Sequence, residues 1–87
     1  MHEAKRWNVT LDIDEHEGRT RAVAHLHTRD ARSLTGEGLA RLNPADRDVP
    51  EIGDELAVAR ALDDLAHHLL AAAADDLEGA ASARTDA

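Results

Sequence analysis

The chain has 87 residues, no cysteine and a formal net charge of −8 at pH 7. This length allows one domain with a thin core, which a second subunit often helps to stabilise, and the lack of cysteine excludes disulfides and thiolate metal sites. No apolar run reaches the length of a signal-peptide core or a membrane span, so we expect a soluble cytoplasmic protein.

The acidic excess lies entirely in the second half of the chain. Residues 1–42 carry seven Lys or Arg and seven Asp or Glu, whereas residues 43–87 carry three basic and eleven acidic residues. Because charge distribution matters more than its sum for partner binding, the net charge does not exclude an anionic partner for the first half.

The first predicted strand covers residues 7–14, with apolar side chains at every second position: Trp7, Val9, Leu11 and Ile13. A period of two with β-branched and aromatic residues is typical of a half-buried strand, and we expect these four side chains to face inward. Residues 15–18 predict a polar hairpin turn in which Gly18 takes a positive φ.

Two more strands are predicted, at residues 19–28 and 34–42, with a charged turn at 29–32 between them. The inward set of the second strand is Thr20, Ala22, Ala24 and Leu26, and its outward set is Arg19, Arg21, Val23, His25 and His27. The inward set of the third strand is Leu34, Gly36, Gly38, Ala40 and Leu42. Glycine and alanine on this face make a shallow floor on which a helix can lie close.

Residues 43–50 contain two prolines and predict a loop, after which a helix begins near Pro50 and stops near Gly79. Its expected apolar face is Ile52, Leu56, Ala59, Leu62, Leu65, Ala66, Leu69, Leu70, Ala73 and Leu77. Its expected polar face is Arg60, Asp64, His67, His68, Asp75 and Glu78. Such a helix is roughly 40 Å long, so its far end needs a partner beyond a three-stranded sheet.

These elements predict an α+β fold, a three-stranded antiparallel β-meander packed on one face by a single long C-terminal helix (βββα). The domain would cover residues 7–78, between an N-terminal tail at 1–6 and a flexible C-terminal tail at 79–87. The uncovered face of the sheet would expose Asn8, Thr10, Asp12, Arg19, Arg21, His25, His27, Glu37 and Arg41.

Three blocks of sequence, at residues 7–13, 14–22 and 36–56, resemble a small actinobacterial family of uncharacterised proteins with a double-stranded-RNA-binding-domain-like fold. The third block, GEGLARLNPADRDVPEIGDEL, is the most specific. The resemblance implies a homodimer that is similar in structure to ribosome hibernation promoting factors. It also implies a role in dormancy, stress survival or translation arrest.

Cationic side chains follow the outward face of the second strand and its neighbour: Arg19, Arg21, His25, His27 and Arg41. They could bind RNA phosphates, because guanidinium groups pair bidentately with phosphate. They could equally form a solvated strand face paired with Asp12, Asp14 and Glu37. RNA-binding sheets usually add stacking aromatics, but the one Phe, Trp or Tyr residue here, Trp7, is assigned to the inward face. The net charge of −8 also departs from the basic character of hibernation factors. Both interpretations stay open.

The sequence predicts no metal, no cofactor and no enzymatic activity. His25 and His27 share a strand face, but no third ligand joins them. The stretch from Asp12 to Gly18 is similar to the start of a calcium loop, yet its glycine is one place late, which favours an acidic hairpin turn. No serine or histidine has the setting of a nucleophile.

Excess apolar surface predicts a homodimer, through the third strand or the helix, with Leu39, Leu65, Leu69, Leu70 and Leu77 as interface residues. The alternative for Leu39 is packing under the 43–50 loop. Two functions follow. One is a stress or dormancy factor acting on the ribosome or structured RNA. The other is a homodimeric protein-interaction module whose acidic helix binds a basic partner through Asp63, Asp64, Asp75 and Asp76.

Overall fold

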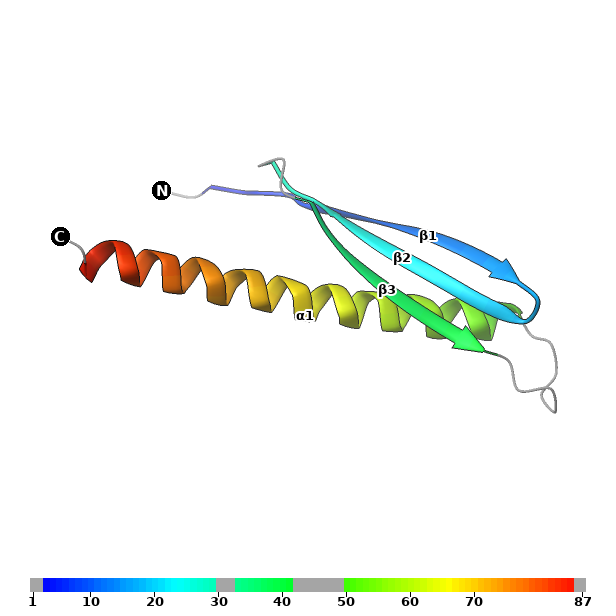
Figure 1. Cartoon of the computed structure of the whole chain (residues 1–87). Coiled ribbons are helices and arrows are strands. Elements are labelled where there is room, and N and C mark those ends of the chain that lie inside the picture. The colour runs from blue at the N-terminus through cyan, green and yellow to red at the C-terminus, as the bar shows by residue number, and fades with distance from the viewer. Residues whose placement is uncertain (1–2, 30–32, 42–49, 86–87) are drawn as a thin grey trace.

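The computed structural model describes residues 3–29, 33–41 and 50–85. Strands β1 (Asn8–His16), β2 (Arg19–His27) and β3 (Ser33–Arg41) precede one helix, α1 (Pro50–Thr85). The strands form an antiparallel sheet in the order β1-β2-β3, and α1 covers one face of it (Figure 1). The predicted βββα architecture and the helix start at Pro50 are confirmed. The predicted turn residues 30–32 and loop residues 42–49 lie outside the described residues.

A two-residue turn joins β1 to β2 and sets their register. Both turn residues have positive φ, 50° at Glu17 and 73° at Gly18, the combination that favours a tightly twisted hairpin. The register places Leu11 opposite Ala24 and Ala24 opposite Gly36. Directly opposed residues point to the same side of a sheet, so the predicted inward sets of the three strands do share one face.

The helix lies unusually deep on β3 because that strand presents glycines beneath it. A Cβ at Gly36 would overlap backbone atoms of Ala61 and Leu65, and one at Gly38 would overlap the carbonyl oxygen of Ala57. The predicted shallow floor is therefore confirmed. The buried apolar core is small: Ala22, Ala24, Leu26, Ala40, Ala57, Ala61 and Leu65.

The face of α1 that contacts the sheet differs from the predicted one. Its buried positions recur every four residues and are mostly small: Gly53, Ala57, Ala61 and Leu65. The larger residues assigned to the buried face are exposed to 37–72%: Ile52, Leu56, Leu62, Leu69, Leu70 and Leu77. Small residues lie at the contact with the sheet because only they let the helix backbone approach the glycines of β3. Among the predicted apolar-face residues, Leu65 alone is buried.

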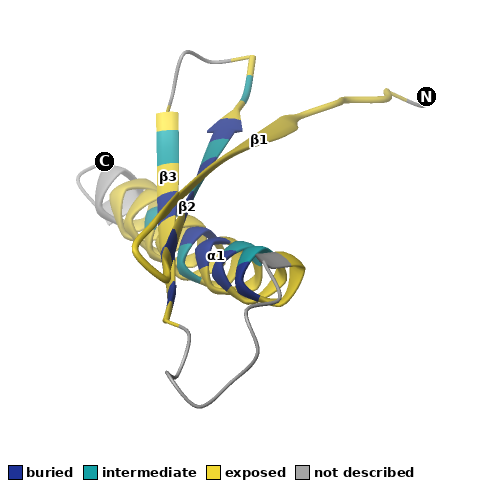
Figure 2. Ribbon diagram, turned by 90° about the vertical axis from the view of Figure 1, so that its right-hand side faces the viewer, coloured by how far each residue is buried: buried dark blue, intermediate teal, exposed yellow. Residues whose placement is uncertain are grey.

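Strand β1 lies outside the cover of the helix. Helix α1 runs along β2 and β3, and β1 stands off to one side of it with all nine residues exposed (Figure 2). Trp7, Val9, Leu11 and Ile13 are 53%, 43%, 39% and 47% exposed. They share the helix-side face as predicted but are not buried in the core, because one helix about 10 Å wide spans only two strands spaced about 4.8 Å apart.

The helix is also longer than predicted. It passes through Gly79 and continues to Thr85, which at about 1.5 Å per residue makes it roughly 54 Å long. A lone glycine costs a helix only about 1 kcal/mol, and the alanines around it favour helix. The predicted flexible tail at 79–87 is thus helical as far as 85. Residues 73–81 are all exposed, so this part of α1 is not covered by the sheet.

Candidate interaction surfaces

The open face of the sheet carries the predicted cationic residues, but in two separate groups. At one end, His16 lies opposite Arg19 and Arg19 lies opposite Arg41. At the other end, His25 and His27 lie opposite Thr10 and Asn8. The sequence placed all of these side chains on one face correctly. The sequence did not show that Arg21, which lies between the two groups, forms an ion pair with a carboxylate.

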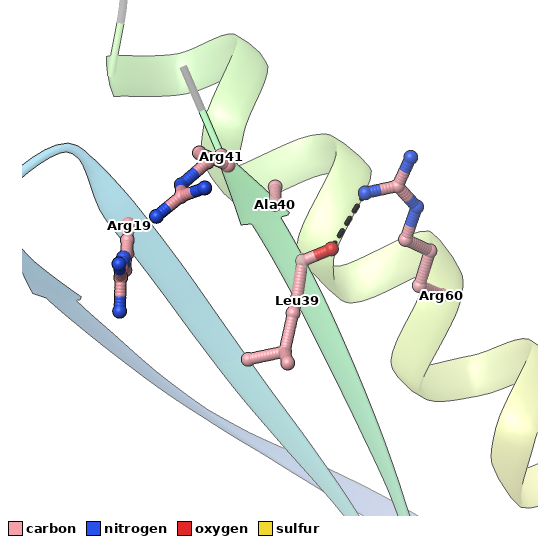
Figure 3. Close-up of a pocket in the computed structure, with 5 residues that line it drawn as sticks. All are labelled: Arg19, Leu39, Ala40, Arg41 and Arg60. Carbon is pink, nitrogen blue, oxygen red and sulfur yellow. Dashed lines mark hydrogen bonds between the residues drawn. The ribbon is translucent and has the colours of Figure 1, made fainter. Parts of the chain in front are cut away.

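The arginine end forms a shallow hollow of about 370 Å³ lined by Arg19, Leu39, Ala40, Arg41 and Arg60. Arg19 and Arg41 lie side by side on the open face, whereas Arg60 reaches the far side of β3, where its Nη1 donates to the carbonyl oxygen of Leu39 over 2.6 Å (Figure 3). Within residues 3–29, 33–41 and 50–85, Arg19 and Arg41 have no ion-pair partner. Two facing guanidinium groups without a carboxylate favour an anionic partner. We call these five residues the arginine hollow.

Arg21 differs from its two neighbours because Glu37 neutralises it. Its Nε donates to Oε1 of Glu37 over 2.9 Å, diagonally across the two strands. The hydrogen bond from Arg21, and then its charge, lower the pKa of the Glu37 carboxyl below its ordinary value. The same contact raises the pKa of Arg21. Arg21 is therefore a weaker candidate for binding an external anion than Arg19 or Arg41.

The two histidines of β2, His25 and His27, contact side chains of β1. Nε2 of His25 lies 3.2 Å from Oδ2 of Asp12, and Nε2 of His27 lies 3.0 Å from Oγ1 of Thr10. Their rings stack with centroids 6.4 Å apart. In the part of the chain that the structure describes, no group of three or more His, Cys, Asp or Glu side chains is placed to hold a metal ion.

Helix α1 caps the outer edge of β3 with three polar side chains. Arg60 donates to the oxygen of Leu39, the amide of Glu37 donates to Oδ2 of Asp64 over 2.9 Å, and Nδ1 of His68 lies 2.7 Å from the oxygen of Thr35. Four helical residues rise about 6 Å, close to the length of two strand residues. Every fourth residue of α1 therefore meets every second residue of β3. Arg60, Asp64 and His68 belong to the predicted polar face of the helix, and their role at the strand edge was not predicted. Their spacing of four residues, which places them on one side of a helix, could have indicated a shared contact.

An apolar flank lies on the opposite side of α1, under β1. At 100° per residue, Leu62 and Leu69 project roughly opposite Asp64, which contacts the edge of β3, so they lie toward β1. Leu62 is 41% and Leu69 37% exposed. We define the apolar flank as these two leucines together with the helix-side residues of β1 and its approach: Trp7, Val9, Leu11 and Ile13.

The predicted interface residues are distributed over three places. Leu39 is 58% exposed on the open face, and Leu69 belongs to the apolar flank. Leu70 and Leu77 are 69% and 72% exposed on the outer half of α1. Leu65, in contrast, is 5% exposed and packs in the core of its own chain, which removes it from the candidate interface. The loop proposed to cover Leu39 lies outside the described residues.

Fold and surfaces together define a small α+β protein: an open three-stranded sheet with one polar face and one face that its helix only partly covers. The chain belongs to the Rv2632c-like family, whose model matches residues 5–86. It is 58% identical over 77 residues to the uncharacterized protein Mb1767 of Mycobacterium bovis, covering 88% of this chain and 81% of that one. It is 51% identical over 77 residues to the uncharacterized protein Rv2632c of Mycobacterium tuberculosis, covering 88% and 82%.

The crystal structure of Rv2632c is similar over nearly the whole chain. The two align with a TM-score of 0.82 and 49% sequence identity, covering 91% of this chain and 93% of that one. The resemblance to a family of uncharacterised actinobacterial proteins is thereby confirmed, whereas the link to dormancy and to hibernation factors stays a prediction. In residues 3–29, 33–41 and 50–85, no helix combines the length and the apolar character that crossing a membrane requires.

Proposed function

We propose that this protein is a non-enzymatic cytoplasmic binding module that acts as a homodimer. The observation that carries the proposal is that the larger apolar side chains lie outside while the core is built mainly from alanine and glycine. A monomer rarely leaves so many large apolar residues together on one side unless a partner covers them. A second copy of the same chain is a partner that is always present at matching concentration.

Burial of the apolar flank would contribute substantially to association. Its six residues are 37–53% exposed. A fully buried Leu, Ile or Val side chain contributes about 1.5–3 kcal/mol relative to water, so burying the exposed half of each contributes about 1 kcal/mol. The acidic residues Asp63 and Asp75 are also exposed. They would remain available to a basic protein partner of the dimer.

The test is the molar mass in solution, measured by size exclusion with light scattering. The wild type should be a dimer at micromolar concentration. Leu11→Lys should give a monomer, because a charge in a buried apolar contact is strongly unfavourable. Thr35→Lys, on the open face of β3, is the matched control and should stay dimeric. A wild-type monomer, or a dimer unchanged by Leu11→Lys, would argue against this surface.

A second candidate function is contact with RNA, including the ribosome, in a stress or dormancy setting. The observation that favours it is the arginine hollow, where Arg19 and Arg41 lie opposite each other in the sheet and form no ion pair with any carboxylate of the described residues. Phosphate contacts by such residues release counterions and make binding strongly dependent on salt. The acidic α1 would then point away from the nucleic acid.

Ribosome co-sedimentation and RNA filter binding across 50–200 mM salt test the second candidate. The double variant Arg19→Ala, Arg41→Ala should bind about tenfold more weakly, with a shallower salt dependence. Arg21→Ala is the matched control, since Glu37 already neutralises that charge. If the wild type does not bind at 50 mM salt, or if all three proteins bind equally, RNA contact through this hollow is wrong.

A further inference from the structure

The two edges of the sheet are not equivalent, and only one is open to another strand. The outer edge of β3 is occupied by Arg60, Asp64 and His68 of α1. Within residues 3–29, 33–41 and 50–85, no comparable side chains cover the outer edge of β1, all of whose residues are exposed. A nine-residue uncapped edge strand is a ready template for pairing with a second strand.

The hydrogen-bonding pattern shows which β1 residues offer their backbone. The amide of Glu37 and the oxygens of Thr35 and Leu39 point outward from β3, toward α1. Backbone groups alternate between the two sides of a strand, and the register carries this alternation across β2 to β1. The residues of β1 whose N–H and C=O point away from β2 are therefore Val9, Leu11, Ile13 and Glu15.

Charge along this edge is polarised. Its beginning is basic, with Lys5 and Arg6, and its end is acidic, with Asp14 and Glu15. The chain before β1 continues in line with the strand (Figure 1). Two such edges repel each other when parallel, because like charges meet, and attract each other when antiparallel. The edge is therefore self-complementary only in the antiparallel orientation, as a two-fold symmetric interface requires.

We propose that two copies of this chain join β1 to β1 in antiparallel orientation about a two-fold axis at Thr10, giving one continuous six-stranded sheet. This inference rests on the proposed homodimer and specifies its geometry. In this register Val9 meets Leu11 of the partner subunit, Trp7 meets the partner's Ile13, Arg6 meets the partner's Asp14, and Lys5 meets the partner's Glu15. Each of these four pairs joins two apolar residues or one basic and one acidic residue.

Neighbouring registers fit less well. Moving the axis from Thr10 to Leu11 places Trp7 opposite the partner's Glu15, and an axis at Asp12 places two carboxylates face to face. Both registers lose an apolar or an oppositely charged pair. The axis at Thr10 also brings the two apolar flanks together on the same side of the joined sheet, because directly opposed residues share a face.

Single-cysteine cross-linking tests this geometry cleanly because the chain has no cysteine of its own. Thr10 would sit at a non-hydrogen-bonded pair on the axis, where Cα atoms are about 4.5 Å apart, within the range of a disulfide. Thr10→Cys should therefore oxidise to a covalent dimer. Asn8→Cys should not, because its two copies would be separated by four strand residues, about 13 Å. Asp12→Cys should not either, for the same reason.

Charge reversal gives an independent readout. The variant Lys5→Glu, Arg6→Glu should dimerise at least tenfold more weakly, and mixing it with Asp14→Lys, Glu15→Lys should restore a mixed dimer. A wild-type dimer in which Asn8→Cys or Asp12→Cys cross-links and Thr10→Cys does not would overturn this register. A dimer in which none cross-links would overturn the β1 interface but leave the homodimer standing. A wild-type monomer would overturn both.

Discussion

Gly38 lies against Ala57 so closely that a Cβ on Gly38 would overlap the carbonyl oxygen of Ala57. This contact between β3 and α1 explains the layout of the molecule. It draws the helix over β2 and β3, buries small residues, and leaves β1 and the larger apolar side chains outside. The same contact thus produces both the thin core and the surface that we assign to a second copy.

Alanine at Gly36 or Gly38 should destabilise the fold. The added methyl group has no space between strand and helix, and overpacking of this kind typically costs about 1–3 kcal/mol. Urea unfolding at one fixed protein concentration measures this loss of unfolding free energy. Gly79→Ala is the control, since nothing lies within 4 Å of its Cβ position, and it should be neutral or stabilising by up to about 1 kcal/mol. Equal effects at the three positions would contradict the close approach.

Leu65→Ala should cost about 2–4 kcal/mol in unfolding free energy, because it leaves a cavity in a core whose only other buried leucine among the described residues is Leu26. Leu70→Ala, further along the same helix and 69% exposed, should cost less than about 1 kcal/mol. Both are measured by denaturation at the same protein concentration, because association adds to apparent stability. A similar cost for both would mean that α1 is rotated from the position described.

Asp64→Ala should speed hydrogen exchange of the Glu37 amide, which loses its acceptor. A hydrogen bond contributes roughly 1 kcal/mol net, so about fivefold faster exchange is expected. Asp63→Ala is the matched control, since that carboxylate pairs only with His67 on the helix surface. An unchanged Glu37 amide in Asp64→Ala would show that the helix does not protect this edge in solution.

The Glu37 carboxyl should titrate below the ordinary glutamate value, and Arg21→Ala should return it there. Because the folded pKa is the lower one, the pair stabilises the fold above the unfolded pKa, and that contribution disappears as pH falls through the folded pKa. A carbon-detected NMR titration of wild type and variant measures both values. Identical titration of Glu37 in the two proteins would exclude the ion pair.

Local patterns predicted the strands, their faces and the start of the helix well. Alternation along the strands gave the shared face of the sheet, and Pro50 marked the start of the helix, because these features depend on neighbours in the sequence. The depth and lateral position of α1 depend on contacts between distant residues. A reading based on large apolar side chains assigned the wrong helix face, whereas the actual contact joins the glycines of β3 to small residues at every fourth helical position.

The candidate surfaces were predicted only in part, because some of their features depend on local sequence patterns and others on contacts between distant residues. The open-face position of Arg19, Arg21 and Arg41 followed from the period of the strands. The pairing of Arg21 with Glu37, and the role of Arg60 at the strand edge, depended on the strand register and on the rotation of the helix. Neither the strand register nor the rotation of the helix can be predicted from a single segment of the sequence.

The most direct test of the central claim is the molar mass of the wild-type chain in solution across concentrations from one to a few hundred micromolar. The exposed apolar flank and the uncapped β1 edge predict a stable species of twice the 9.4 kDa chain mass. A mass of one chain throughout that range would contradict the account.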